Sequence, residues 1–342
     1  MSESGDDERE YVFTIPSIEE LQSSIRDESA PIAKRMRTVF LLKQIGDSDA
    51  LETLNEGLHS QSVLLGHECA YALGQMQNPL AVPWLTTAVQ DKTLDPIVRH
   101  ECVEALANIG APGTEELISS LCDDPCSEVS DTAIIAIEKI RRAKKEIEES
   151  NDSAPQSKYY SVDPAPPLPS NNIEELQSKL NDRSASLYDR YRAMFTLRNI
   201  GSHAAIDALA SSLDGDDSPV FRHEIAYVLG QIADPHSLTC LKKLLANKNE
   251  HAMVRHEAAE AIGAIAEEAS EDMLRSYLDD NNENIIVKES CHVALDLVDY
   301  WNNDDVSTAL EQEEENNGNE KIINEKMTNR RSLTDDIPLS SF

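Results

Sequence analysis

The chain has 342 residues, which is enough for two hydrophobic cores of ordinary domain size. Hydrophobic residues make up 40% of it and aromatic residues only 5%, a composition that favours helix over sheet. No apolar run approaches the roughly 18–20 residues of a membrane span, and the N-terminus has no signal-peptide character. We therefore expect a soluble cytoplasmic protein, with the nucleus as an additional compartment. The net charge of −33 argues against binding to nucleic acid or anionic membranes and suits a cationic partner.

The middle of the chain consists of a duplicated unit. The segment RTVFLLKQIG at 37–46 matches RAMFTLRNIG at 192–201, and further matches recur at nearly the same offset. The duplication gives an N-terminal and a C-terminal half, separated by a segment rich in Pro, Ser and acidic residues that we expect to be a flexible linker. Both ends of the chain are acidic and are expected to be disordered. The predicted division is an N-terminus at 1–15, halves at 16–145 and 171–302, a linker at 146–170 and a tail at 303–342.

Each half is predicted to contain four pairs of amphipathic helices. Asp, Asn, Pro or Gly separates the helices, as helix ends require. In the second half the predicted pairs are 171–182 with 186–200, 202–213 with 218–232, 235–247 with 251–266, and 269–279 with 283–301. Antiparallel helix pairs that repeat in this way stack into a solenoid of the HEAT type. The predicted fold is therefore all-α, with two pseudo-symmetric halves of four helix pairs each.

A His-Glu pair begins four similar helices, in the two inner units of each half. The four copies are GHECAYALGQM at 66–76, RHECVEALANIG at 99–110, RHEIAYVLGQI at 222–232 and RHEAAEAIGAIA at 255–266. The two copies in each half are 33 residues apart, and the outer units carry other residues at this position. A single His-Glu pair is usually a solvated helix start. Because four copies share one register, they indicate a function instead.

The histidines lie outside the apolar stripes of their helices. In the helix that begins near Val254, the stripe runs through Ala258 and Ile262, and His256 lies nearly opposite to it. Equivalent positions on neighbouring helix pairs are about 10 Å apart, so two imidazoles can share one metal ion at bonds of about 2.0–2.2 Å. If the halves face each other, two ions are expected between them, each held by two histidines and one carboxylate. The candidates are His67, Glu68, His100 and Glu101 in one half, and His223, Glu224, His256 and Glu257 in the other.

Two histidines, one carboxylate and open coordination positions are typical of non-haem iron oxygenases. The sequence contains no HExxH, Walker, GxSxG or dinucleotide motif. Two other interpretations remain open at this point. One is a non-catalytic scaffold that binds a basic peptide on an acidic concave face. The other is a hydrolase or lyase that uses the same ligands with zinc or manganese.

The four His-Glu motifs, their spacing and the duplication resemble the deoxyhypusine hydroxylase family over roughly 15–145 and 171–301. The resemblance implies a di-iron centre that activates O2 and hydroxylates the deoxyhypusine side chain on the precursor of translation initiation factor five-A. It implies that His67, His100 and Glu101 bind one iron, and that His223, His256 and Glu257 bind the other. It also implies that Glu68 and Glu224 bind the cationic substrate. The chain departs from the family pattern at Gly66 and Ala107, neither of which is a ligand position.

Overall fold

A computed structural model describes residues 16–149, 157–214 and 218–302. These residues form sixteen α-helices and three short 3-10 helices and contain no strand. None of the described helices is long and apolar enough to cross a membrane. The predicted N-terminus and tail lie outside the described residues.

The helices of the N-terminal half form four consecutive pairs. Their bounds are α1 Ile18–Arg26, α2 Ile32–Ile45, α3 Ser48–Gly57, α4 Val63–Gln75, α5 Val82–Gln90, α6 Pro96–Ile109, α7 Thr114–Leu121 and α8 Ser127–Glu149. The helices of the C-terminal half repeat this order. Their bounds are α9 Ile173–Leu180, α10 Leu187–Ile200, α11 His203–Ser211, α12 Pro219–Ile232, α13 Leu238–Ala246, α14 Ala252–Ile265, α15 Glu271–Asp279 and α16 Ile285–Asn302. The predicted all-α fold is confirmed.

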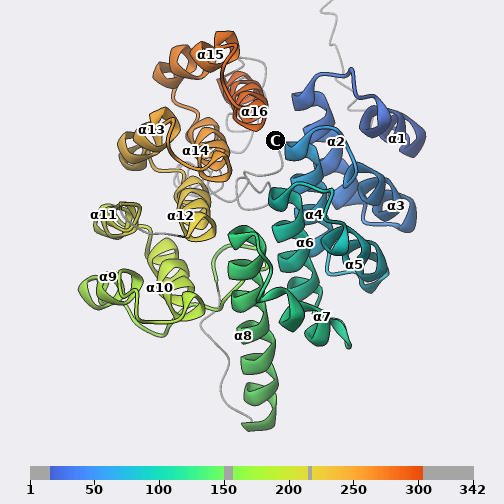
Figure 1. Ribbon diagram of the computed structural model, residues 1–342. Coiled ribbons are helices and arrows are strands. Elements are labelled where there is room, and N and C mark those ends of the chain that lie inside the picture. Colours follow the sequence, from blue (N-terminus) through green and yellow to red (C-terminus); the bar gives the residue numbers. More distant parts are fainter. Residues whose placement is uncertain (1–15, 150–156, 215–217, 303–342) are drawn as a thin grey trace, which may run out of the picture.

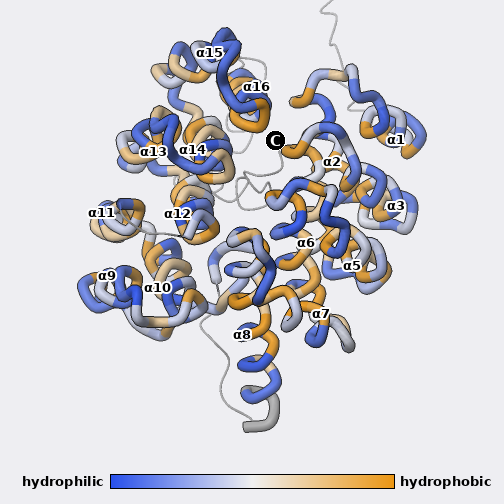
Figure 2. Tube along the Cα trace, in the orientation of Figure 1, coloured by the Kyte–Doolittle hydropathy of each residue, from blue (hydrophilic) through white to orange (hydrophobic). Residues whose placement is uncertain are grey.

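The second helix of each pair lines the inside of the molecule. Figure 1 shows α4 and α6 facing α12 and α14, with α3, α5, α11 and α13 on the outside. The halves meet on both sides of this centre, where α16 packs against α2 and α8 packs against α10 and α12. Hydrophobic and hydrophilic residues alternate along the helices (Figure 2). The outer helices bury one stripe, whereas nearly all residues of the inner helices α4, α12 and α14 are buried.

Buried arginines fasten the inner helices to their neighbours. Arg99 Nε donates to the carbonyl of Val89 at the end of the preceding helix, at 2.9 Å, and Arg255 Nε does the same to Leu245. Each guanidinium also binds a carboxylate of the following repeat, Asp124 in one half and Glu283 in the other. These contacts fix the height at which α6 and α14, two of the four His-Glu helices, sit in the stack.

The linker was predicted at 146–170. Residues 146–149 instead belong to α8, residues 150–156 lie outside the described residues, and residues 157–170 pack against both halves. The Val162 N–H donates to Gln75 Oε1 at 2.8 Å in the N-terminal half. On the other side, the buried guanidinium of Arg198 binds Asp163 at 2.6 and 2.8 Å. It also lies over the ring of Tyr159, at 4.4 Å from the centroid. The composition of this segment is typical of a flexible linker. The residue that holds it in place, Arg198, lies far along the chain, so the local sequence does not predict the contact.

Candidate metal centre

The four His-Glu pairs occupy one register on their helices. His67, His100, His223 and His256 are each the fifth residue of α4, α6, α12 and α14. Ser62, Asp95, Ser218 and His251 cap these helices with their side chains, and α6 and α12 also begin with Pro. Because the caps fix where each helix begins, they place all four imidazoles on the inner face at the same depth.

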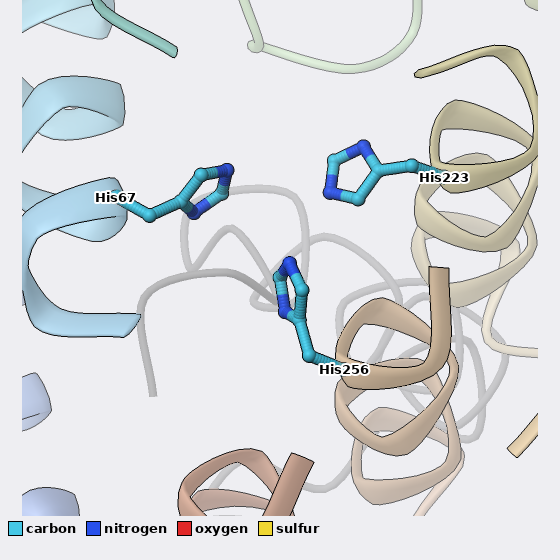
Figure 3. Close-up of side chains that lie close together, drawn as sticks. All are labelled: His67, His223 and His256. Atoms are coloured by element: carbon cyan, nitrogen blue, oxygen red, sulfur yellow. The ribbon is translucent and has the colours of Figure 1, made fainter. Parts of the chain in front are cut away.

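The four imidazoles converge in the centre of the molecule. Figure 3 shows His67, His223 and His256 reaching toward one another from opposite halves. The ring centroids of His67 and His256 are 5.3 Å apart, and those of His100 and His223 are 5.7 Å apart. The histidines are between 0 and 6% exposed. The sequence placed them outside the apolar stripes, but the opposite half covers them, so they are buried between the halves.

All four Nε2 atoms are buried and have no hydrogen-bond partner among the described residues. The same is true of both carboxylate oxygens of Glu257. A buried polar atom without a partner costs about 1–3 kcal/mol. One such atom is a small cost to the stability of a fold. So many of them around one centre indicate a binding site for an ion or a ligand. The donor set of imidazole nitrogens and carboxylates suits a metal ion.

The described residues contain three groups whose ligand atoms lie within 4.8 Å of one another, namely His67/His100/Glu101, His67/His223/His256 and His256/Glu257/Glu260. The first is one of the predicted trios. The second predicted trio, His223/His256/Glu257, is divided between the other two groups, although His223 Nε2 lies 3.3 Å from a Glu257 oxygen.

Burial controls the charge of the histidines. It holds the pKa of His100 and His256 well below the usual range, which keeps these rings neutral and able to bind metal. Burial also acts to lower the pKa of His67, but the nearby carboxylates of Glu101 and Glu68 outweigh it and raise that pKa well above its usual value.

The Nδ1 side of three rings is held by a neighbouring side chain. Glu68 Oε1 lies 2.9 Å from His67 Nδ1, and Glu260 Oε1 lies 3.4 Å from His256 Nδ1. Thr132 of α8 lies 3.4 Å from His100 Nδ1. Such contacts orient a metal-binding imidazole so that its Nε2 points inward.

An acidic cavity opens beside the histidines. It is small, with a cavity volume of about 20 Å³, is partly open to solvent, and reaches both His67 and His223. Its carboxylates are Glu101, Glu104, Glu224 and Asp163. Tyr71 and Tyr227, whose hydroxyls are 3.0 Å apart, form part of its wall, and Val162–Pro164 of the linker form another. Of the two predicted substrate-binding residues, only Glu224 lines this cavity.

Sequence reasoning did not assign a role to the residues four positions after each histidine. These residues are Tyr71, Glu104, Tyr227 and Glu260, an alternation of Tyr and Glu that the duplication repeats. Residues four apart share one face of a helix, so the spacing could have revealed them. The contribution of Val162–Pro164 had no such signal.

The repeats and the buried histidines define the class of protein to which the molecule belongs. A family model described as HEAT repeats matches residues 18–96 and 173–252, and one described as PBS lyase HEAT-like repeat matches 254–280. The molecule is therefore a HEAT-repeat protein with a buried His/Glu group that could bind metal.

Relatives of known function narrow the class to one family. The chain is 41% identical over 271 residues to the deoxyhypusine hydroxylase of Danio rerio, covering 79% of this chain and 88% of the relative. It is 40% identical over 298 residues to that of Rattus norvegicus, covering 87% and 97%. The solved structure of human deoxyhypusine hydroxylase in complex with glycerol superposes with a TM-score of 0.77 at 39% identity, covering 83% of this chain and 96% of the human one. The chain belongs to the deoxyhypusine hydroxylase family.

Family membership confirms the resemblance and the expected enzyme class, a deoxyhypusine monooxygenase. It also weighs against the non-catalytic scaffold and the hydrolase or lyase, because the relatives are hydroxylases.

Proposed function

We propose that this enzyme uses two iron ions and O2 to hydroxylate the deoxyhypusine side chain on the precursor of translation initiation factor five-A. The observation that carries the proposal is the set of four buried, unpartnered imidazole nitrogens that converge between the halves. The family's name supplies the substrate, and the acidic cavity beside the histidines supports it.

In this proposal His67, His100 and Glu101 hold one iron, and His223, His256 and Glu257 hold the other. Two histidines and one carboxylate leave coordination positions free, and iron bound in this way supplies the oxidising chemistry for O2-dependent hydroxylation. The contacts of Glu68, Thr132 and Glu260 to Nδ1 atoms keep the rings in position for binding.

The cavity carboxylates recognise the substrate by charge. Deoxyhypusine is a long alkyl chain bearing ammonium groups, so a carboxylate in a partly dry cavity can hold it by a charge-assisted hydrogen bond. Glu224 lines the cavity and makes no hydrogen bond or ion pair to any described residue, so its carboxylate is available for this contact. Our prediction for Glu68 has weaker support, because that carboxylate is fully buried and bonded to His67.

The test is an assay of the purified full chain with the deoxyhypusine-containing precursor, with and without O2. We expect the precursor to gain one oxygen atom only when iron and O2 are both present. Equal activity with zinc or manganese under anaerobic conditions would instead support hydrolase or lyase chemistry. The Glu224→Gln variant should raise KM for the precursor while it keeps its iron, since Glu224 is proposed to bind only the substrate.

A further inference from the structure

The duplication creates two acidic clusters around the histidines, and they are not alike. A shift of 156 residues relates Glu224, Glu101 and Glu104 to Glu68, Glu257 and Glu260. The paired Tyr71 and Tyr227, also 156 residues apart, lie between the clusters. We call the first set the linker-side cluster and the second set the closed cluster.

The closed cluster is sealed, and two of its carboxylates already have partners. Glu68, Glu257 and Glu260 are 0, 1 and 1% exposed. Glu68 is bonded to His67, while Glu260 accepts a hydrogen bond of 2.8 Å from Ser290 of α16 and contacts His256. Residue Ser290 of α16 therefore lies directly against this cluster.

The linker-side cluster faces the cavity instead. Glu224 is 95% buried, since its exposed fraction is 5%, yet its carboxylate has no hydrogen bond or ion pair within the described part of the chain. Glu104 is half-buried and likewise makes no such bond to a described residue. The nearest cation that acts on Glu104 is Lys139, and its ammonium is already bonded to Asn108 and to the Asp163 carbonyl.

Glu104 lies in a partly buried site next to another carboxylate, Glu101. Burial raises the pKa of Glu104 to about 8, with Glu101 adding to the effect. A cation beside Glu104 would offset the repulsion from Glu101 and favour the charged carboxylate.

The duplication supplies each helix twice, but a single linker joins the halves. The two sides of the histidines therefore differ. Val162–Pro164 form the outer wall of the cavity, fixed to the N-terminal half through Gln75 and Lys139 and to the C-terminal half through Arg198. On the other side of the histidines, Ser290 contacts the duplicate of Glu104 directly. A single substrate side chain needs only one entrance to the site. Residues Val162–Pro164 of the linker form a wall of that entrance.

We propose that Glu104 acts with Glu224 as a second substrate-binding residue, and that the ammonium-bearing substrate chain enters only through the linker-side cavity. The inference rests on the proposed function for the identity of the substrate. It assigns Glu260, the duplicate of Glu104, to positioning His256.

The experiment compares Glu104→Gln with its duplicate, Glu260→Gln, in the full iron-loaded chain. Glu104→Gln removes a charge but keeps the shape, so we expect KM for the precursor to rise about 10- to 100-fold, with kcat much less affected and iron content unchanged. Glu260→Gln should leave KM near the wild-type value and lower the iron content or kcat. Exposed Glu116→Gln serves as a surface control with wild-type values.

A second measurement does not depend on turnover. Binding of putrescine, a short alkyl diamine, is followed by calorimetry, and it should weaken about tenfold or more in Glu104→Gln but not in Glu260→Gln. A folded, iron-loaded Glu104→Gln variant with KM and diamine affinity within twofold of wild type would overturn the proposal. An equal rise of KM in both variants would also overturn it. Wild-type protein that binds diamine through Glu104 but never hydroxylates the precursor would refute the proposed function and leave the cation site standing.

Discussion

In the N-terminal half, the residue four positions after the second histidine is Glu104, which faces a cavity; in the C-terminal half it is Glu260, which binds Ser290 and His256. The sequence around both is nearly the same. The surroundings differ because the linker lies beside one and α16 beside the other. Two residues related by the duplication can therefore have different roles. Mutating both members of such a pair provides an internal control.

The largest expected effect separates Arg198 from its N-terminal equivalent, Lys43. The Arg198 guanidinium is fully buried and bound to Asp163, whereas Lys43 is only partly buried. Arg198→Met leaves the Asp163 carboxylate without its cation, so we expect a loss of about 3–5 kcal/mol in the free energy of unfolding. Lys43→Met should change it by about 0.5 kcal/mol or less. Urea denaturation measures both, and similar losses would show that the linker contact contributes little.

The proposed ligands are expected to be equally indispensable in the two halves. His100→Ala and His256→Ala should each lose iron and lower activity by more than about 100-fold, because each removes one of three protein bonds to an ion. His292→Ala, on an exposed position of α16, should keep both. Metal analysis beside the activity assay tests this. Retention of full iron in either inner variant would remove that histidine from the ligand set.

A smaller effect distinguishes Gly263 from its equivalent, Ala107. A Cβ at Gly263 would lie 2.6 Å from Ala294 Cα, so Gly263→Ala must push α14 and α16 apart. We expect this to cost about 1–3 kcal/mol in stability. Ala107 is already accommodated in α6, and Ala107→Gly should cost only about 0.5–1 kcal/mol through helix propensity. Thermal or urea unfolding would show whether the order is reversed.

The smallest effect concerns the two contacts between the halves. On one side Glu128 binds His251 at 2.9 Å, and this hydrogen bond lowers the pKa of Glu128. On the other side Glu289 accepts from Ser62, but burial raises its pKa.

A depressed pKa stabilises the fold above the unfolded value of about 4.5, and that stability is lost as the pH falls below it. Glu128→Gln should therefore flatten the acid loss of stability by less than about 1 kcal/mol, since His251 is about one-third exposed. Glu289→Gln should have the opposite sign and slightly stabilise the protein near neutral pH. Stability measured against pH that shows the same sign for both variants would contradict this assignment.

The helix pairs could be predicted from the sequence, because the amphipathic period and the residues that end each helix are local features. The helix predicted at 251–266, for example, is observed as Ala252–Ile265. It was also sufficient to single out the four histidines, since their register repeats. It could not predict that Glu68 turns toward His67, or that Val162–Pro164 wall the cavity. Those features depend on contacts between segments that are distant in the sequence. The duplicated motifs look alike in the sequence, so their different surroundings could not be predicted from it.

We propose that the four Nε2 atoms without hydrogen-bond partners, together with their carboxylates, hold two iron ions. Elemental analysis of the purified full chain, with a visible absorption spectrum recorded before and after exposure to O2, tests it most directly. We expect about two iron atoms per chain and an absorption band that depends on O2. A fully folded protein with no stoichiometric metal, or with zinc in place of iron and no response to O2, would contradict it.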